Sequence, residues 1–212
     1  MMKGAACMAK EGILLVLSGP SGAGKGTICQ ELLRSYPGLN YSISATTRKA
    51  RVGEQHGVNY WFVSREDFEN MIKDDELLEW AEVYGNFYGT PCRQVRELLQ
   101  NGKDIVLEID AQGATQIKKK FPQGVFVYIA PPSLDELATR IHKRGTDSLD
   151  VIKKRLSCAN SELTYVHNYN YVVVNDEVKE ATNKVAAIIT AEKCQVARNS
   201  NIVEEILSTF NK

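Results

Sequence analysis

The sequence has no surplus of charge of either sign, since 26 Lys and Arg residues stand against 26 Asp and Glu residues in 212. Without a global basic surplus, a protein does not hold nucleic acid or an anionic membrane through its overall field, so any anion site must be local. The longest apolar run near the N-terminus, residues 13–17, has five residues, whereas a helix that crosses a bilayer needs about 20. We therefore expect no nucleic-acid partner and no membrane-spanning helix.

Targeting and cross-linking signals are also missing. Residues 1–10 lack the apolar core and cleavage pattern of a secretory signal, so we interpret them as a loose leader and expect a cytoplasmic protein. The five cysteines are an odd number without a Cys-x-x-Cys pair, and the three histidines stand at no metal-ligand spacing. A disulfide framework and a zinc cluster are therefore disfavoured, and we expect reduced cysteines.

Apolar runs that predict strands alternate with helical segments. Hydrophobic residues at 43% and charged residues at 25% are typical of a globular protein, large enough here for one domain with modest insertions. Residues 13–17 are apolar on both faces, as a central parallel strand must be, and a helix over 27–35 follows. Residues 104–109, 125–129 and 171–174 predict three more core strands. The predicted fold class is α/β, a parallel sheet flanked by helices.

Residues 43–93 depart from this alternation. Short strands predicted at 60–63 and 78–83 surround one helix, which Ser64 opens with Asp67 at the reciprocal capping position. This pattern predicts an inserted α+β lobe.

A second insertion is predicted at residues 135–165, which are helical and rich in Arg and Lys. Ser133 is its expected N-cap, with Glu136 three places on. A last helix over 177–195 is expected to close the core. The predicted division is residues 1–42, 94–134 and 166–212 for the core, 43–93 for the lobe and 135–165 for the second insertion.

A glycine-rich turn joins the first predicted strand to its helix. Its glycines let backbone N–H groups turn inward, the helix N-terminus adds a positive dipole end, and Lys25 can reach the β- and γ-phosphates of a nucleotide. Gly26 stands where the Walker pattern has a Mg²⁺-ligating Ser or Thr, so we expect nucleotide oxygens to hold most of the metal, with a contribution from Thr27. The predicted phosphate site is Gly19, Pro20, Ser21, Gly22, Ala23, Gly24, Lys25, Gly26 and Thr27.

Two carboxylates stand at the end of the strand predicted at 104–109. Glu108 and Asp110 project from the carboxyl end of that strand, near the glycine-rich turn. One interpretation is a helix cap or a solvated turn, and the other is a place near Mg²⁺ or a second substrate. A GTPase is disfavoured because residues 183–186, the nearest match to Asn-Lys-x-Asp, lack the acid.

The lobe carries groups suited to a nucleoside monophosphate. Arginine forks bind phosphate bidentately, so Arg48 and Arg51 can grip a monoester dianion. Glu79 stands among apolar neighbours, where an unpaired carboxylate is costly. A guanine edge offers N1–H and N2–H₂ side by side, which a carboxylate accepts together, whereas adenine presents an acceptor there.

With these motifs the sequence closely resembles guanylate kinase over nearly its whole length. The matching segments are residues 19–27, 44–51 with their Thr-Thr-Arg-x-x-Arg core, 78–80, 85–90, 107–113, 130–133, 140–145, 154–156 and 174–176. The resemblance implies a core, a GMP-binding lobe and a helical lid that closes. It also implies Mg²⁺-dependent in-line transfer from ATP to GMP, and to dGMP, giving ADP and GDP for guanine nucleotide synthesis and GMP recycling.

The resemblance also implies residue roles. Ser44, Arg48, Arg51 and Tyr88 would hold the GMP phosphate, with Tyr60 and Glu108 in the same site. Glu79, Thr90 and Asp110 would read the guanine, Asp110 being a further candidate near the metal. Asn175 would touch the adenine of ATP, and Arg140, Arg144 and Arg155 would close over the transferring phosphoryl group together with Lys25, Arg48 and Arg51.

Two rival functions remain at this point. One is a catalytically inactive guanylate-kinase-like module that binds proteins, against which the presence of Lys25 and the lid arginines argues. The other is a kinase for a different monophosphate, which similar basic pockets could serve. The sequence leaves the oligomeric state open.

Overall fold

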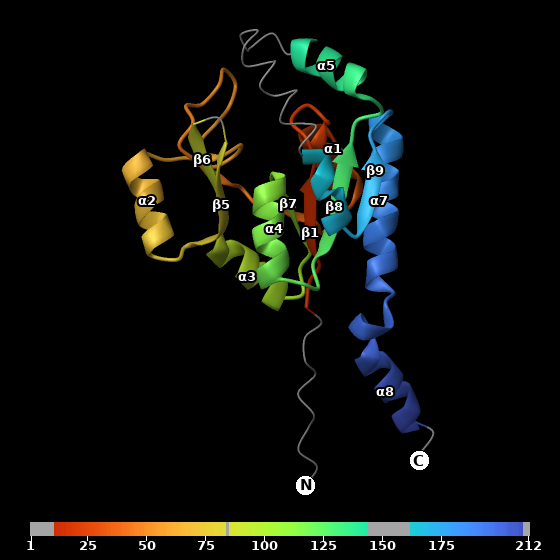
Figure 1. Ribbon diagram of the computed structural model, residues 1–212. Coiled ribbons are helices and arrows are strands. Elements are labelled where there is room, and N and C mark those ends of the chain that lie inside the picture. Colours follow the sequence, from red (N-terminus) through yellow and green to blue (C-terminus); the bar gives the residue numbers. More distant parts are fainter. Residues whose placement is uncertain (1–10, 84, 144–161, 210–212) are drawn as a thin grey trace.

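The computed structural model describes residues 11–83, 85–143 and 162–209 (Figure 1). Its centre is a five-stranded parallel sheet with the strand order β2-β7-β1-β8-β9. These strands are β1 (Leu14–Ser18), β2 (Asn40–Tyr41), β7 (Ile105–Glu108), β8 (Val125–Ala130) and β9 (Tyr171–Val174). In the register Leu17 pairs with Glu108, and Ser18 pairs with Tyr128, so β1, β7 and β8 end at the same edge. The predicted α/β class and parallel sheet are confirmed.

Helices cover both faces of this sheet because β1 is apolar on both. Leu15 and Leu17 pack with α1 (Lys25–Ser35) and α7 (Val178–Lys193) in one cluster. Leu14 and Val16 point to the other face and pack with α3 (Cys92–Gln100) and α4 (Ala111–Lys120). Figure 1 shows α4 between the core sheet and β5 (Leu77–Val83) of a second sheet.

The second sheet has four strands in the order β4-β3-β6-β5. They are β3 (Ala45–Thr46), β4 (Trp61–Phe62), β5, and β6 (Asn86–Pro91). The helix α2 (Arg65–Lys73) packs on this sheet through buried Phe68. Its predicted cap is confirmed, since the Asp67 N–H donates to Ser64 Oγ at 3.0 Å.

The sequence predicted only two strands in this lobe, and β3 and β6 are additions. The two residues of β3 form too short a run to show a period, and β6 contains Gly89 and Pro91, which disfavour strands. In β5 and β6, Glu79 lies directly opposite Thr90.

The remaining helices of the described residues are α5 (Leu134–Lys143), α8 (Ser200–Thr209) and the short η1 (Thr164–Asn168) and η2 (Val196–Arg198). The Glu136 N–H donates to Ser133 Oγ at 3.0 Å, which confirms the predicted start of α5. The helix predicted over roughly 177–195 is confirmed as α7, but the prediction that it is the last helix was wrong, because α8 follows it. The short η2 connects α7 to α8, and α8 extends beyond the core in Figure 1.

None of the helices in the described ranges is both long and apolar enough to traverse a bilayer. The cysteines at 29, 92 and 194 are free thiols.

Candidate active site

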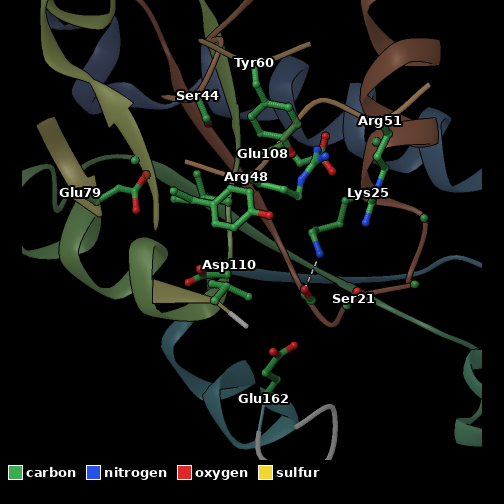
Figure 2. A pocket seen from close by; sticks show the side chains of 18 residues that line it. Ser21, Lys25, Ser44, Arg48, Arg51, Tyr60, Glu79, Glu108, Asp110 and Glu162 are labelled. Atoms are coloured by element: carbon green, nitrogen blue, oxygen red, sulfur yellow. Dashed lines mark hydrogen bonds between the residues drawn. The ribbon is translucent and has the colours of Figure 1, made fainter. Parts of the chain in front are cut away.

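One cavity brings together groups from the core and from the lobe (Figure 2). Figure 2 shows Glu79 at one end and Ser21 and Lys25 toward the other, with Arg48 between them. The lining residues that the sequence predicted are Gly19, Ser21, Gly22, Gly24, Lys25, Gly26, Ser44, Arg48, Arg51, Tyr60, Glu79, Tyr88, Glu108 and Asp110. The cavity therefore presents cationic side chains from the core and from the lobe to one space.

The glycine-rich turn forms the core side of the cavity. Gly24 is left-handed with φ +89°, and a Cβ there would lie 2.3 Å from Asn175 Nδ2, so only glycine fits. The Lys25 ammonium donates to the carbonyl oxygens of Gly19 at 2.6 Å and Pro20 at 3.1 Å. The turn thus curls around the lysine that follows it, with helix α1 beginning at that lysine.

Asn175, a predicted ATP-site residue, and Arg140, a predicted lid arginine, lie outside the cavity lining and support this turn. Asn175 is buried, and its Nδ2 donates to Ala23 O at 2.7 Å. Arg140 donates to Asn175 O at 2.9 Å and to Glu136 Oε1 at 2.8 Å. In this structure Arg140 therefore joins α5 to the segment after β9.

The lobe side of the cavity is built around Arg48. Its two terminal nitrogens donate to both Glu54 carboxylate oxygens, at 3.0 and 2.9 Å, and its side chain is only 14% exposed. The Arg51 N–H donates to Glu54 Oε2 at 2.7 Å, so one carboxylate joins both arginine positions. Partial burial of Glu54 acts to raise its pKa, but the hydrogen bonds from Arg48 outweigh this effect and hold the pKa of Glu54 below its ordinary value. The Arg48 guanidinium also lies 5.4 Å from the centre of the Tyr60 ring.

Glu79 stands at the far end of the cavity and is 4% exposed. The Thr90 hydroxyl donates to Glu79 Oε1 at 2.6 Å. Burial raises the pKa of Glu79 to about 8, and the negative charge of Asp110 acts in the same direction, although the Thr90 hydrogen bond favours the charged form. This carboxyl group is thus poised to ionise when hydrogen-bond donors reach it.

The structure confirms the first of the two interpretations of Asp110, a helix cap, whereas its place near Mg²⁺ or a second substrate stays a prediction. Its Oδ1 caps α4, accepting from the backbone N–H groups of Gln112 at 2.7 Å and Gly113 at 2.9 Å. The same residue lines the cavity. A capping carboxylate held at the carboxyl end of β7 is well placed to face a ligand.

Glu108 lies against the position where Walker loops carry a hydroxyl. A Cβ on Gly26 would be 3.4 Å from both Glu108 carboxylate oxygens. Thr27 is exposed and does not line the cavity. Within the described residues, no three His, Cys, Asp or Glu side chains converge as a metal site.

Some predicted residues lie outside the cavity lining, and some lining residues were not predicted. Pro20, Ala23, Thr27, Thr90, Arg140 and Asn175 do not line it, and Arg144 and Arg155 lie outside the described residues. Glu54, which pairs with Arg48, was missed, although its spacing from Arg48 and Arg51 in steps of three is a signal. Glu162 also lines the cavity without a sequence signal, and burial raises its pKa while the charge of Lys25 opposes the shift.

Comparison with known proteins gives consistent matches. A family model described as guanylate kinase matches residues 11–192. The chain is 57% identical over 195 residues to a guanylate kinase of Desulfitobacterium hafniense, covering 92% of this chain and 98% of that one. It is 55% identical over 197 residues to a guanylate kinase of Caldanaerobacter subterraneus, with 93% and 96% covered. The crystal structure of guanylate kinase from Anaplasma phagocytophilum aligns with a TM-score of 0.77 at 34% identity, over 89% of this chain and 90% of that chain.

Proposed function

The chain belongs to the guanylate kinase family, and we propose that its cavity holds ATP and GMP end to end and transfers the γ-phosphoryl group of ATP to GMP, giving ADP and GDP. The observation that carries this proposal is the shared cavity, which takes Lys25 from the core and Arg48, Arg51 and Glu79 from the lobe. Lys25 and the glycine-rich turn suit a donor triphosphate, and the arginine pair between Lys25 and Glu79 suits an acceptor monoester.

The donor would bind on the glycine-rich turn. Lys25 already donates to two backbone carbonyls of that turn, and phosphate oxygens would replace them as stronger acceptors. Asn175 supports the turn through Ala23, and in the proposal it also contacts the adenine. The proposed ATP site is Gly19, Pro20, Ser21, Gly22, Ala23, Gly24, Lys25, Gly26, Thr27 and Asn175.

The acceptor would bind in the lobe with its phosphate toward the core. The phosphate would contact Ser44, Arg48, Arg51 and Tyr88, beside Tyr60 and Glu108, and the base would contact Glu79, Thr90 and Asp110. A buried carboxyl that already holds one hydrogen bond accepts the N1–H and N2–H₂ of guanine well and leaves adenine without a matching donor.

The proposed chemistry needs no covalent nucleophile and no general base. Phosphoryl transfer passes through a loose in-line transition state whose charge spreads over the equatorial oxygens. The second pKa of a phosphate monoester is about 6, so the attacking GMP oxygen is already ionised near neutral pH. The protein's part is to orient the two phosphates and neutralise charge, through Lys25, Arg48 and Arg51, while closure of a lid at residues 135–165 excludes water. Arg140, Arg144 and Arg155 are proposed to join them on closure, since one such arginine can be worth about 10³–10⁵ in rate.

The residues of the cavity fit Mg²⁺ that arrives with the nucleotide. Gly26 supplies no hydroxyl ligand, and the Glu108 carboxylate faces the space beside it. We propose that Mg²⁺ is held mainly by ATP phosphates, with Asp110 acting directly or through water; the predicted contribution of Thr27 is not supported, because Thr27 is exposed and lies outside the cavity lining. When bound, the ion neutralises charge that develops on the β- and γ-phosphate oxygens.

The proposal includes dGMP as a second acceptor, because none of the assigned contacts involves the 2′-hydroxyl. The reaction would serve guanine nucleotide synthesis and GMP recycling in the cytoplasm. The alternative is an inactive protein-binding module of the same family. The intact Lys25 turn facing the arginine pair favours the enzyme, since a module without catalysis does not need a donor site.

The test measures ADP formation by purified protein with ATP, Mg²⁺ and one monophosphate at a time: GMP, dGMP, AMP, UMP or CMP. We expect rapid ADP formation with GMP, slower formation with dGMP and little with the others. Binding of GMP without ADP formation would favour the inactive module. Rapid ADP formation with AMP, UMP or CMP but not with GMP would favour a kinase for another monophosphate.

A further inference from the structure

Helix α4 lies alongside the free edge of the lobe's sheet (Figure 1). β5 is an outer strand in the order β4-β3-β6-β5, so its outward N–H and C=O groups need partners other than a strand. Asp110, Gly113 and Gln116 follow one another at intervals of three, which places them on one side of α4. Both contacts described below are made from that side.

Gln116 pairs with the edge of β5 as a neighbouring strand would. The Trp80 N–H donates to Gln116 Oε1 at 3.2 Å, and Gln116 Nε2 donates to the Trp80 carbonyl oxygen at 2.7 Å. One primary amide thus satisfies both backbone groups of a single residue. Trp80 directly follows Glu79 in β5, so this contact holds the peptide next to the proposed guanine-reading carboxyl.

Gly113 makes the second contact, with the side chain of Glu79. A Cβ on Gly113 would lie 2.3 Å from Glu79 Oε2 and 2.9 Å from Glu79 Cδ. The Glu79 carboxyl group therefore rests directly on α4, one turn before Gln116. The position of Glu79 relative to Asp110 depends on how α4 and β5 are held together.

We infer that Gln116 is a positioning residue for base selectivity, because its amide sets the placement of Glu79 against α4 through the Trp80 backbone. The inference rests on the proposed function and adds a residue that touches neither nucleotide. Lys25, Arg48 and Arg51 come from α1 and from the segment after β3, so loosening the α4–β5 contact alters base recognition more than phosphate binding.

The test compares Gln116→Met with Gln112→Met, a matched control at an exposed glutamine one turn earlier on the same helix. Steady-state kinetics with GMP and with IMP separate an effect on base recognition from an effect on phosphate binding, because IMP lacks the 2-amino group from which Glu79 would accept a hydrogen bond. A hydrogen bond to a charged group is worth about tenfold or more in affinity. We expect Gln116→Met to lower kcat/KM for GMP by about tenfold, mainly through KM, with a change of less than about threefold for IMP and for the KM of ATP.

A second variant reaches Glu79 through the other contact. Gly113→Ala raises helix propensity, but its Cβ would lie 2.3 Å from Glu79 Oε2 and therefore displaces the Glu79 carboxyl group directly, so we expect the same fall in the GMP to IMP ratio. Thermal unfolding of all variants is recorded beside the kinetics, and Gln116→Glu, which keeps an acceptor for the Trp80 N–H but loses the donor to the Trp80 carbonyl oxygen, decides the outcome if Gln116→Met does not fold. An unchanged GMP to IMP ratio in the folded variants overturns the inference. Wild-type protein that forms no ADP with GMP instead overturns the proposed function, and the inference with it.

Discussion

Replacing Glu79 with Gln should remove a pH dependence from the stability of the protein without nucleotide. Burial raises the pKa of Glu79 from 4.5 to about 8 in the folded state, whereas the unfolded chain has the ordinary value. The folded state thus holds a proton that the unfolded state releases, and this contribution to stability is fully present below pH 4.5 and is lost as pH rises through about 8. Between these values, one such group changes the free energy of unfolding by about 1.4 kcal/mol per pH unit.

The assay is guanidinium chloride unfolding of wild type and Glu79→Gln at pH about 5.5, 6.5 and 7.5. Subtracting the two free energies of unfolding at each pH isolates Glu79 from the other titrating groups. Gln keeps an acceptor for the Thr90 hydroxyl but cannot ionise. We expect wild type to lose up to about 1.4 kcal/mol per pH unit relative to the variant. Parallel pH profiles would refute the argument that this carboxyl is protonated in the free protein.

The proton held by Glu79 in the free protein should be released when nucleotide binds. Since guanine donors favour the ionised carboxylate, GMP binding near neutral pH should release about one proton from Glu79. Calorimetric titrations in buffers of different ionisation enthalpy measure this release, which we expect in wild type and not in Glu79→Gln. The variant should also discriminate less against AMP in competition. Equal proton release by both proteins would remove Glu79 from the base site.

Three further substitutions test the phosphate contacts. Arg48→Ala should raise the KM for GMP by about tenfold to a hundredfold and lower kcat, with ATP affinity nearly intact; equal losses of both affinities would contradict its assignment to the acceptor site. Glu54→Gln should raise the KM for GMP by about threefold to tenfold because it loosens the partly buried pairing of Arg48, whereas Glu69→Gln, which breaks an exposed pair, should change KM by less than about twofold; equal effects of the two would argue against positioning by Glu54. Lys25→Met should lower kcat by about a thousandfold or more while the protein still folds and binds GMP, and a mild loss of turnover would show that Lys25 does not neutralise the transferring group.

Much of the core and the cavity was predictable from local sequence. A run that is apolar on both faces and leads into glycines and a lysine has few structural solutions, so β1, the turn and α1 followed directly. The side chains of Lys25, Arg48 and Glu79 were identified because each is a charged residue in a setting where it needs a partner. That they line one cavity was an expectation, and the structure places all three there.

The features that sequence did not reveal depend on contacts between distant segments. Glu54 is one more charged residue in a polar loop until the fold brings Arg48 against it. In the sequence Gln116 looks like an ordinary polar helix residue, because the contact that distinguishes it is made with Trp80 at the edge of β5, 36 positions away. The short β3 and the glycine- and proline-containing β6 are held by pairing with neighbours and not by their own propensity.

The connectivity of the two sheets makes the proposed acceptor site largely modular. β2 ends at Tyr41 and β7 begins at Ile105, and all four strands of the second sheet come from the chain between them. A designer could therefore exchange that continuous stretch for one suited to another base and leave every strand pairing of the donor core intact. The exchanged segment would also need a side chain at position 116 of α4 that fits its outer strand, because Gln116 lies outside the exchanged segment and bonds the backbone of Trp80 within it.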